Sequence, residues 1–71
     1  MNLRELRDKA QLTQRELGEA TGLGQTAIAN YESGYRSPDL NRVARIVVAL
    51  RRRGVKVTID DIIGDLLSNA A

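Results

Sequence analysis

The chain has 71 residues, 42% of them hydrophobic, and a net charge of +2, which leaves room for one small core but not for a large enclosed substrate pocket. Cys and His are both absent, so disulfides, thiolate nucleophiles, imidazole bases and the usual zinc ligands are missing, and no enzyme, metal or cofactor is expected. The charged N-terminal residues lack the apolar stretch of a signal peptide, and no apolar run reaches the ~20 residues of a membrane span. A cytoplasmic protein without membrane contact is therefore expected.

Helix signals recur along the chain and strand alternation is scarce, which predicts an all-α fold, a compact bundle of about five short helices. Asn2 is suited to cap a first helix, with Glu5 three residues later. Thr13 and Glu16 have the spacing of a capping box, so a second helix is predicted from residue 14 to about residue 20.

A third helix is predicted at about residues 24–33, because Gly22 and Gly34 stand where left-handed residues end helices. Ser37 and Pro38 are typical of an N-cap and a first helical residue, so a longer fourth helix is predicted to begin there. Its inner positions are expected to be Leu40, Val43, Ile46, Val47 and Leu50.

Residues 55–57 alternate like a strand but are too few to form a sheet alone, so an extended link is predicted. Thr58 and Asp61 are spaced to cap a fifth helix over residues 59–67. No second domain is visible, and residues 1–71 are interpreted as a single domain.

The second and third predicted helices follow a stricter pattern than two amphipathic helices require. Gly18 lets one helix cross the other closely, and Gly22 supplies the positive φ that a short turn often needs. The pattern predicts a helix-turn-helix at about residues 14–33.

At these positions the chain resembles the lambda-repressor and Cro-like, or XRE, family of helix-turn-helix proteins. The resemblance covers about residues 3–63, and its motifs are specific in combination. It implies a DNA-binding fold in which the third helix enters the major groove. The matching positions are residues 12–17 (LTQREL), Gly22, Ile28, residues 31–34 (YESG), Pro38 and the aliphatic stripe to Leu50.

The outward face of the third helix agrees with this implication. It is small, uncharged and rich in hydrogen-bonding groups, which suits a major groove about 12 Å wide. Gln and Asn can pair with adenine and a methyl group can contact thymine. The alternative for each residue is a neutral surface position. The expected base readers are Gln25, Thr26 and Asn30, with Ala29 as a thymine contact.

Residues around that helix are expected to hold the DNA backbone. Gln14 resembles the family residue that contacts the backbone and braces the first reading Gln, here Gln25. All 11 Lys and Arg lie within residues 1–56, although a solvated charged surface is the more frequent explanation of such an excess. The other expected phosphate contacts are Thr13, Arg15, Tyr35, Arg36 and Arg42.

Arg7 and Glu32 match positions where family members place a buried or half-buried ion pair between the first and third helices. The resemblance therefore assigns them a structural role. Arg51, Arg52 and Arg53 are interpreted as cations favoured in the last turn of a helix, with DNA contact as the less favoured alternative.

Residues 55–71 carry more apolar side chains than a short closing helix needs, which suggests a dimerisation segment. The alternative is a core closed within one chain. Ile62 and Ile63 match the core-closing pair of the family. The side chains left for self-association are Val55, Val57, Leu66 and Leu67.

The leading hypothesis is therefore a dimeric repressor of a phage Cro-like or restriction-modification controller type, bacterial or phage-encoded, acting on a palindromic operator in double-stranded DNA at the nucleoid. Two half-sites about one helical turn apart would each take one module. The alternative is an antitoxin-like or adaptor module that holds a protein partner, such as a toxin, with DNA binding secondary.

Overall fold

The computed structural model describes residues 2–63, which form four helices followed by a short helical segment. No strand occurs within residues 2–63, so the predicted all-α class is confirmed. None of the helices in this part of the chain is long and apolar enough to cross a membrane. The elements are α1 (Leu3–Lys9), α2 (Gln14–Thr21), α3 (Gln25–Ser33), α4 (Leu40–Arg52) and the helical residues 59–63.

The first two helices begin at the predicted capping residues. The Asn2 side chain accepts a hydrogen bond from the Glu5 amide at 2.9 Å. At α2 the Thr13 hydroxyl accepts the Glu16 N–H at 3.0 Å, while the Thr13 N–H donates to the Glu16 carboxylate at 2.9 Å. These hydrogen bonds lower the pKa of Glu16, so the stabilisation from this box is complete at neutral pH and is lost as the pH falls through the lowered pKa.

The start of α4 differs from the prediction. Asp39, not Ser37, is the N-cap, because its carboxylate accepts the Arg42 N–H at 2.8 Å. Pro38 therefore lies before the helix. Leu40 becomes the first helical residue and is 63% exposed, so its assignment to the inner stripe is wrong. The buried stripe begins one turn later, at Val43.

The core is built almost entirely from aliphatic side chains of all four helices. Leu17 and Ile28 are fully buried where α2 meets α3, and Ile46 and Leu50 are fully buried on α4. Tyr31 and Leu23 pack against this cluster from its edge. Because leucine, isoleucine and valine fill the core without aromatic rings, the short helices can approach one another closely.

The segment after α4 closes the core of the same chain. Val55 and Val57 are 8% and 2% exposed and belong to the core together with Ile62. The expectation that these two valines cover a second copy is therefore corrected: their surface is already buried within the chain. Leu66 and Leu67, the other two expected dimerisation residues, lie outside the described residues.

The predicted fifth helix begins as expected. The Thr58 N–H donates to the Asp61 carboxylate at 2.9 Å, and the Thr58 hydroxyl accepts the Asp61 N–H at 3.2 Å. This capping box lies between an extended link at residues 55–57 and the helical residues 59–63.

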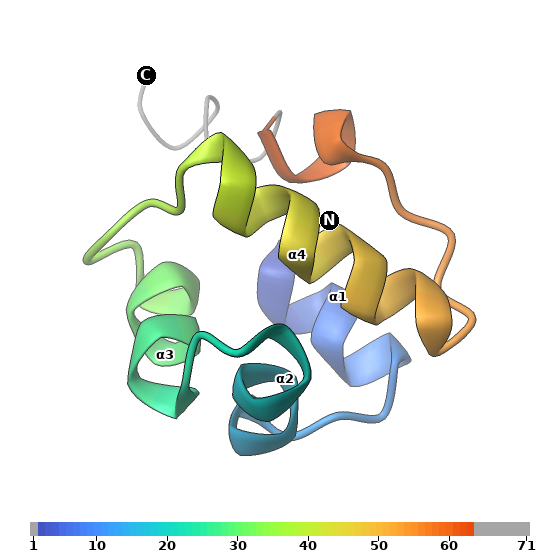
Figure 1. Cartoon of the computed structure of the whole chain (residues 1–71), viewed down its shortest axis with the longest axis horizontal. Helices are drawn as coiled ribbons and strands as arrows, with labels where there is room; N and C mark the ends of the chain where they lie inside the picture. Colours follow the sequence, from blue (N-terminus) through green and yellow to red (C-terminus); the bar gives the residue numbers. More distant parts are fainter. Residues whose placement is uncertain (1, 64–71) are drawn as a thin grey trace.

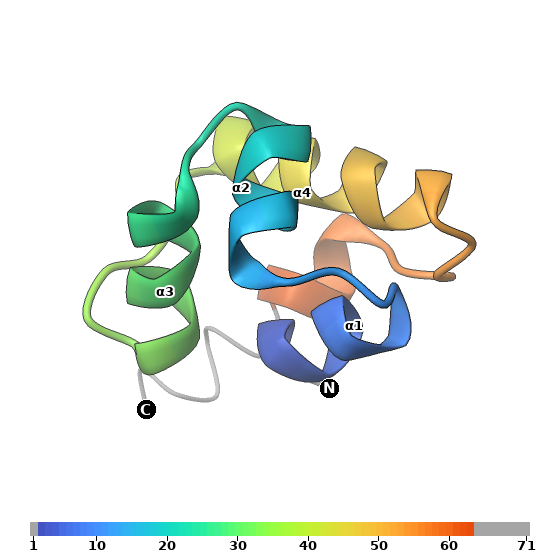
Figure 2. The same ribbon diagram turned by 90° about the horizontal axis from the view of Figure 1, so that it is seen from below.

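The arrangement leaves one helix at the edge of the molecule. Helix α2 packs against both α3 and α4, and α1 contacts α3. In two perpendicular views α3 stands at the left edge, while α4 runs across the body of the molecule (Figures 1 and 2). Within residues 2–63, one side of α3 therefore faces away from the other helices and carries exposed side chains such as Gln25 and Thr26.

Candidate nucleic-acid interface

The close crossing of α2 and α3 fixes the direction of α3. A Cβ atom placed on Gly18 would lie 2.6 Å from the backbone nitrogen of Gln25 and 2.7 Å from the carbonyl oxygen of Gly24. No larger side chain fits there without moving the backbone of α3. The left-handed turn at Gly22, with φ of 75°, then leads directly into this contact. The predicted roles of Gly18 and Gly22 are confirmed.

Thr21 also holds this turn and is not singled out by the sequence pattern. Its side chain is buried, and its hydroxyl donates to the Leu17 carbonyl oxygen at 2.8 Å. The same hydroxyl accepts the Leu23 N–H at 3.3 Å. A polar residue at the end of a helix, directly before a glycine, is the signal that would have identified it.

The outward side of α3 carries the four residues expected to read bases. Gln25 and Thr26 are exposed, while Ala29 and Asn30 are half-buried one turn later. The fully buried Ile28 fixes the inner side of the helix. The face combines amide, hydroxyl and methyl groups and carries no charge, which matches the chemistry of base edges in the major groove.

Glu32 lies at the centre of a hydrogen-bonded cluster that ties α3 to α1 and α2. Arg7 Nε donates to Glu32 Oε2 at 2.6 Å, and Arg7 Nη2 donates to Glu32 Oε1 at 3.1 Å. The side chains are 12% and 7% exposed, so the predicted ion pair is present and nearly buried. Arg7 Nη1 also donates to the Leu12 carbonyl oxygen at 2.9 Å. Hydrogen bonding to Glu32 raises the pKa of Arg7.

Gln14 joins this cluster instead of bracing Gln25. Its Nε2 donates to Glu32 Oε1 at 3.2 Å. No hydrogen bond between Gln14 and Gln25 occurs among the described residues, so the expected brace is absent from this structure. The reason is the carboxylate of Glu32, which still has an acceptor position free after pairing with Arg7. Gln14 is half-buried at the start of α2, next to the exposed Thr13.

The five residues expected at phosphates are all exposed, and the arginines on α2 and α4 form ion pairs within the chain. Arg15 pairs with Glu19 at 3.2 Å, with both side chains more than 60% exposed. Arg42 pairs with its own cap, Asp39, at 2.5 Å. Such exposed pairs are weak and exchange readily for a phosphate.

The loop between α3 and α4 carries the remaining two of these five. The Arg36 guanidinium lies 5.8 Å from the centre of the Tyr35 ring, and Tyr35 is 75% exposed. The loop therefore presents a cation and a hydroxyl group next to the end of α3. Within residues 2–63 no group of three or more carboxylates is placed to hold a metal ion.

Comparison with known proteins agrees with this geometry. The model of a family described as helix-turn-helix matches residues 3–55, most of the chain. A curated relative, the HTH-type transcriptional regulator ImmR of Bacillus subtilis (strain 168), is 39% identical over 44 residues. That alignment covers 62% of this chain but only 35% of the length of ImmR. No solved structure matches the chain significantly.

Proposed function

We propose that this chain, which belongs to the helix-turn-helix family of the lambda-repressor and Cro-like (XRE) type, is a DNA-binding transcription regulator. It reads a specific sequence of double-stranded DNA with α3 and acts as a dimeric repressor. The observation that carries the proposal is the uncharged outward face of α3, on which Gln25 and Thr26 are exposed and Ala29 and Asn30 are half-buried. The side chains there offer donors, acceptors and a methyl group. A helix that is only solvated would more often present Lys and Glu.

Base reading requires that the outward face of α3 is held in a fixed direction. Bidentate contacts to base edges depend on side chains held within a few tenths of an ångström, and loops rarely provide that accuracy. Here the Gly18 crossing fixes one end of α3 against α2. The Glu32 cluster fixes the other end against α1. Both supports lie on the inner side, which leaves Gln25, Thr26, Ala29 and Asn30 free for DNA.

Phosphates on either side of the groove would position the module. Thr13, Gln14 and Arg15 stand at the start of α2, and Tyr35, Arg36 and Arg42 follow α3 along the chain. Contacts of this type set register and orientation but carry no sequence information. They also release counterions, so binding should weaken steeply as salt rises.

The size of one module supports the proposed dimer. A single helix-turn-helix unit buries about 600–1,000 Å² of its own surface on DNA, too little for tight specific binding. The protein measures 30 × 24 × 20 Å, so two copies fit side by side on half-sites about 34 Å apart. Repression then requires only that the pair occupies a promoter and blocks access to it.

The role of Gln25 gives a direct test of base reading. Replacing Gln25 by alanine is expected to cost about 1–3 kcal/mol on the preferred duplex and to relax the preference at one base position, because a bidentate contact to a base edge is lost. Fluorescence anisotropy with the preferred duplex and its single-base variants would measure both effects. An equal loss on every duplex would show instead that Gln25 only positions the helix.

A further inference from the structure

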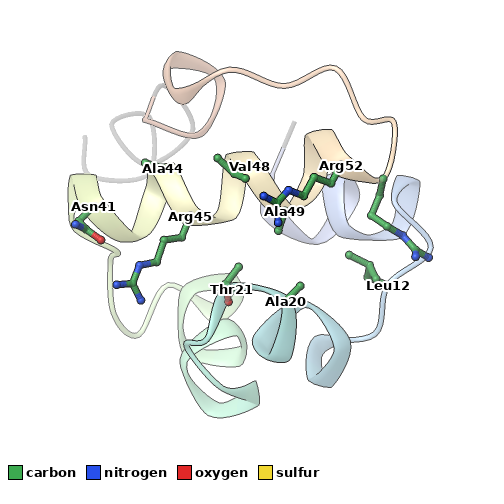
Figure 3. A pocket seen from close by; sticks show the side chains of 10 residues that line it. Leu12, Ala20, Thr21, Asn41, Ala44, Arg45, Val48, Ala49 and Arg52 are labelled. Carbon is green, nitrogen blue, oxygen red and sulfur yellow. The ribbon is translucent and has the colours of Figure 1, made fainter.

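A second surface of the protein is formed by the groove between α2 and α4. We define the α2–α4 groove by three apolar residues, Ala20, Ala44 and Val48, and three arginines, Arg45, Arg52 and Arg53. It is open to solvent and has a volume of about 710 Å³. Figure 3 shows α4 along one side of the groove and α2 along the other.

The floor of the groove is apolar and exposed. Val48 is 48% exposed on a helix whose neighbouring Val47 and Ala49 are buried. Ala20 is also exposed, and Ala44 is half-buried one turn before Val48. The two alanines leave room beside Val48, so another helix could approach closely. A partner that covers these apolar side chains would remove them from water, which would stabilise the complex.

The rim of the groove is strongly basic. Helix α4 carries four arginines and no acidic residue. Within residues 2–63, Arg45 and Arg52 form no ion pair. Arg53 donates to the Ala10 carbonyl oxygen at 3.4 Å, and its positive charge contributes to lowering the pKa of Glu16. Two guanidinium groups on this rim are therefore available for a partner's carboxylates.

These observations indicate one kind of occupant. We propose that the α2–α4 groove binds an acidic amphipathic helix of a partner protein, with apolar residues of that helix on Val48 and its carboxylates on Arg45 and Arg52. A helix as long as α4 spans about 20 Å, so nearly four turns of the partner would fit along it. DNA is the less suitable occupant, because a phosphate backbone would leave the apolar floor uncovered.

The groove contains no residue of α3. The face proposed to read bases and the groove are thus made of different side chains, so a partner bound in the groove does not compete for them. The protein could hold that partner while it is on DNA. This property would bring the partner to an operator.

The test uses ¹⁵N-labelled full-length protein and a synthetic peptide of about 14 residues, long enough for about four helical turns. Its leucines lie on one side of the helix and its glutamates on the flanks. The expected result is a change in the amide signals of Ala20, Ala44 and Val48, with Gln25 and Thr26 unaffected. A rearranged peptide of the same composition, without the leucine stripe, is expected to bind about tenfold more weakly, a difference of ~1.4 kcal/mol.

Matched variants localise the effect to the groove. Arg45→Glu and Val48→Glu are each expected to weaken peptide binding about tenfold, whereas Arg51→Glu, exposed on the same helix but outside the groove, should leave binding unchanged. Val48 is already half-exposed, so its replacement should not unfold the protein.

Three results with the peptide would overturn the proposal. They are no signal change at millimolar peptide, equal binding of the rearranged peptide, and signal changes centred on α3. Changes at the groove on adding a short DNA duplex without peptide would assign the groove to DNA and would also overturn it. If no duplex changes the amide signals of α3, base reading by α3 is contradicted. The peptide experiment then still tests whether the groove binds an acidic helix.

Discussion

Glu32 links α3 to two other helices through its carboxylate. It accepts hydrogen bonds from Arg7 and Gln14, which lie on two other helices, and its side chain is only 7% exposed. The resemblance to the lambda-repressor and Cro-like family predicts the pair with Arg7 correctly. The bond from Gln14 could not be predicted, because it depends on which acceptor the amide reaches once the three helices are packed.

Removing one partner of this pair should be costly. Arg7→Ala is expected to lower the free energy of unfolding by about 3–5 kcal/mol, because the carboxylate of Glu32 would stay nearly buried without its cation. Arg15→Ala, which breaks an exposed pair with Glu19, is the control and should cost less than about 1 kcal/mol. Urea unfolding of both variants would measure the difference. Equal stability of Arg7→Ala and the unmodified protein would contradict the structural role.

Residue-level predictions of surface function are harder to settle from the sequence. The exposure of Gln25 and Thr26 follows directly from the helical period once Ile28 is assigned to the core. The period does not decide whether a residue that completes the core lies within the chain or between two chains. For that reason Val55 and Val57 were expected at a dimer interface, although they close the core of the monomer.

At the scale of secondary-structure elements, the capping residues predict where most of the helices begin. Asn2, Thr13 and Thr58 each start a helix where the sequence places it. The exception is α4, where Ser37 and Asp39 are both good caps only two residues apart. Local sequence does not choose between them, and the structure uses the carboxylate.

Replacing Gly18 or Gly22 in the helix-turn-helix is expected to have separable effects on stability and on DNA binding. Gly18→Ala should destabilise the protein by about 1–3 kcal/mol and also weaken specific DNA binding, because the added Cβ meets the backbone at Gln25 and α3 must shift. Gly22→Ala is the matched control. Its Cβ meets nothing within 4 Å, so only the φ of 75° is strained, at about 1–2 kcal/mol.

Measuring unfolding and DNA affinity of both variants separates the two effects. Gly22→Ala should keep its sequence preference once it is folded, whereas Gly18→Ala should lose part of it even at temperatures where it is fully folded. If both variants keep the same preference, the close crossing does not aim α3.

At the scale of the whole molecule, two different surfaces lie on one small core. Helix α3 stands at the edge of the molecule (Figure 1), and the basic α2–α4 groove lies between α2 and α4 (Figure 3). The fold class and the helix-turn-helix could be predicted from periodicity and glycine spacing. The groove could not, because Ala20 and Val48 become neighbours only when α2 packs on α4.

The proposed function depends on α3 reading a DNA sequence as part of a dimer. The most direct measurement is a selection from random duplex DNA in moderate salt, with sequencing of the bound fraction. A dimer that reads bases should enrich a palindrome whose half-sites lie about ten base pairs apart. A single enriched half-site would contradict the dimer, and a bound fraction with no enriched sequence would contradict base reading by α3.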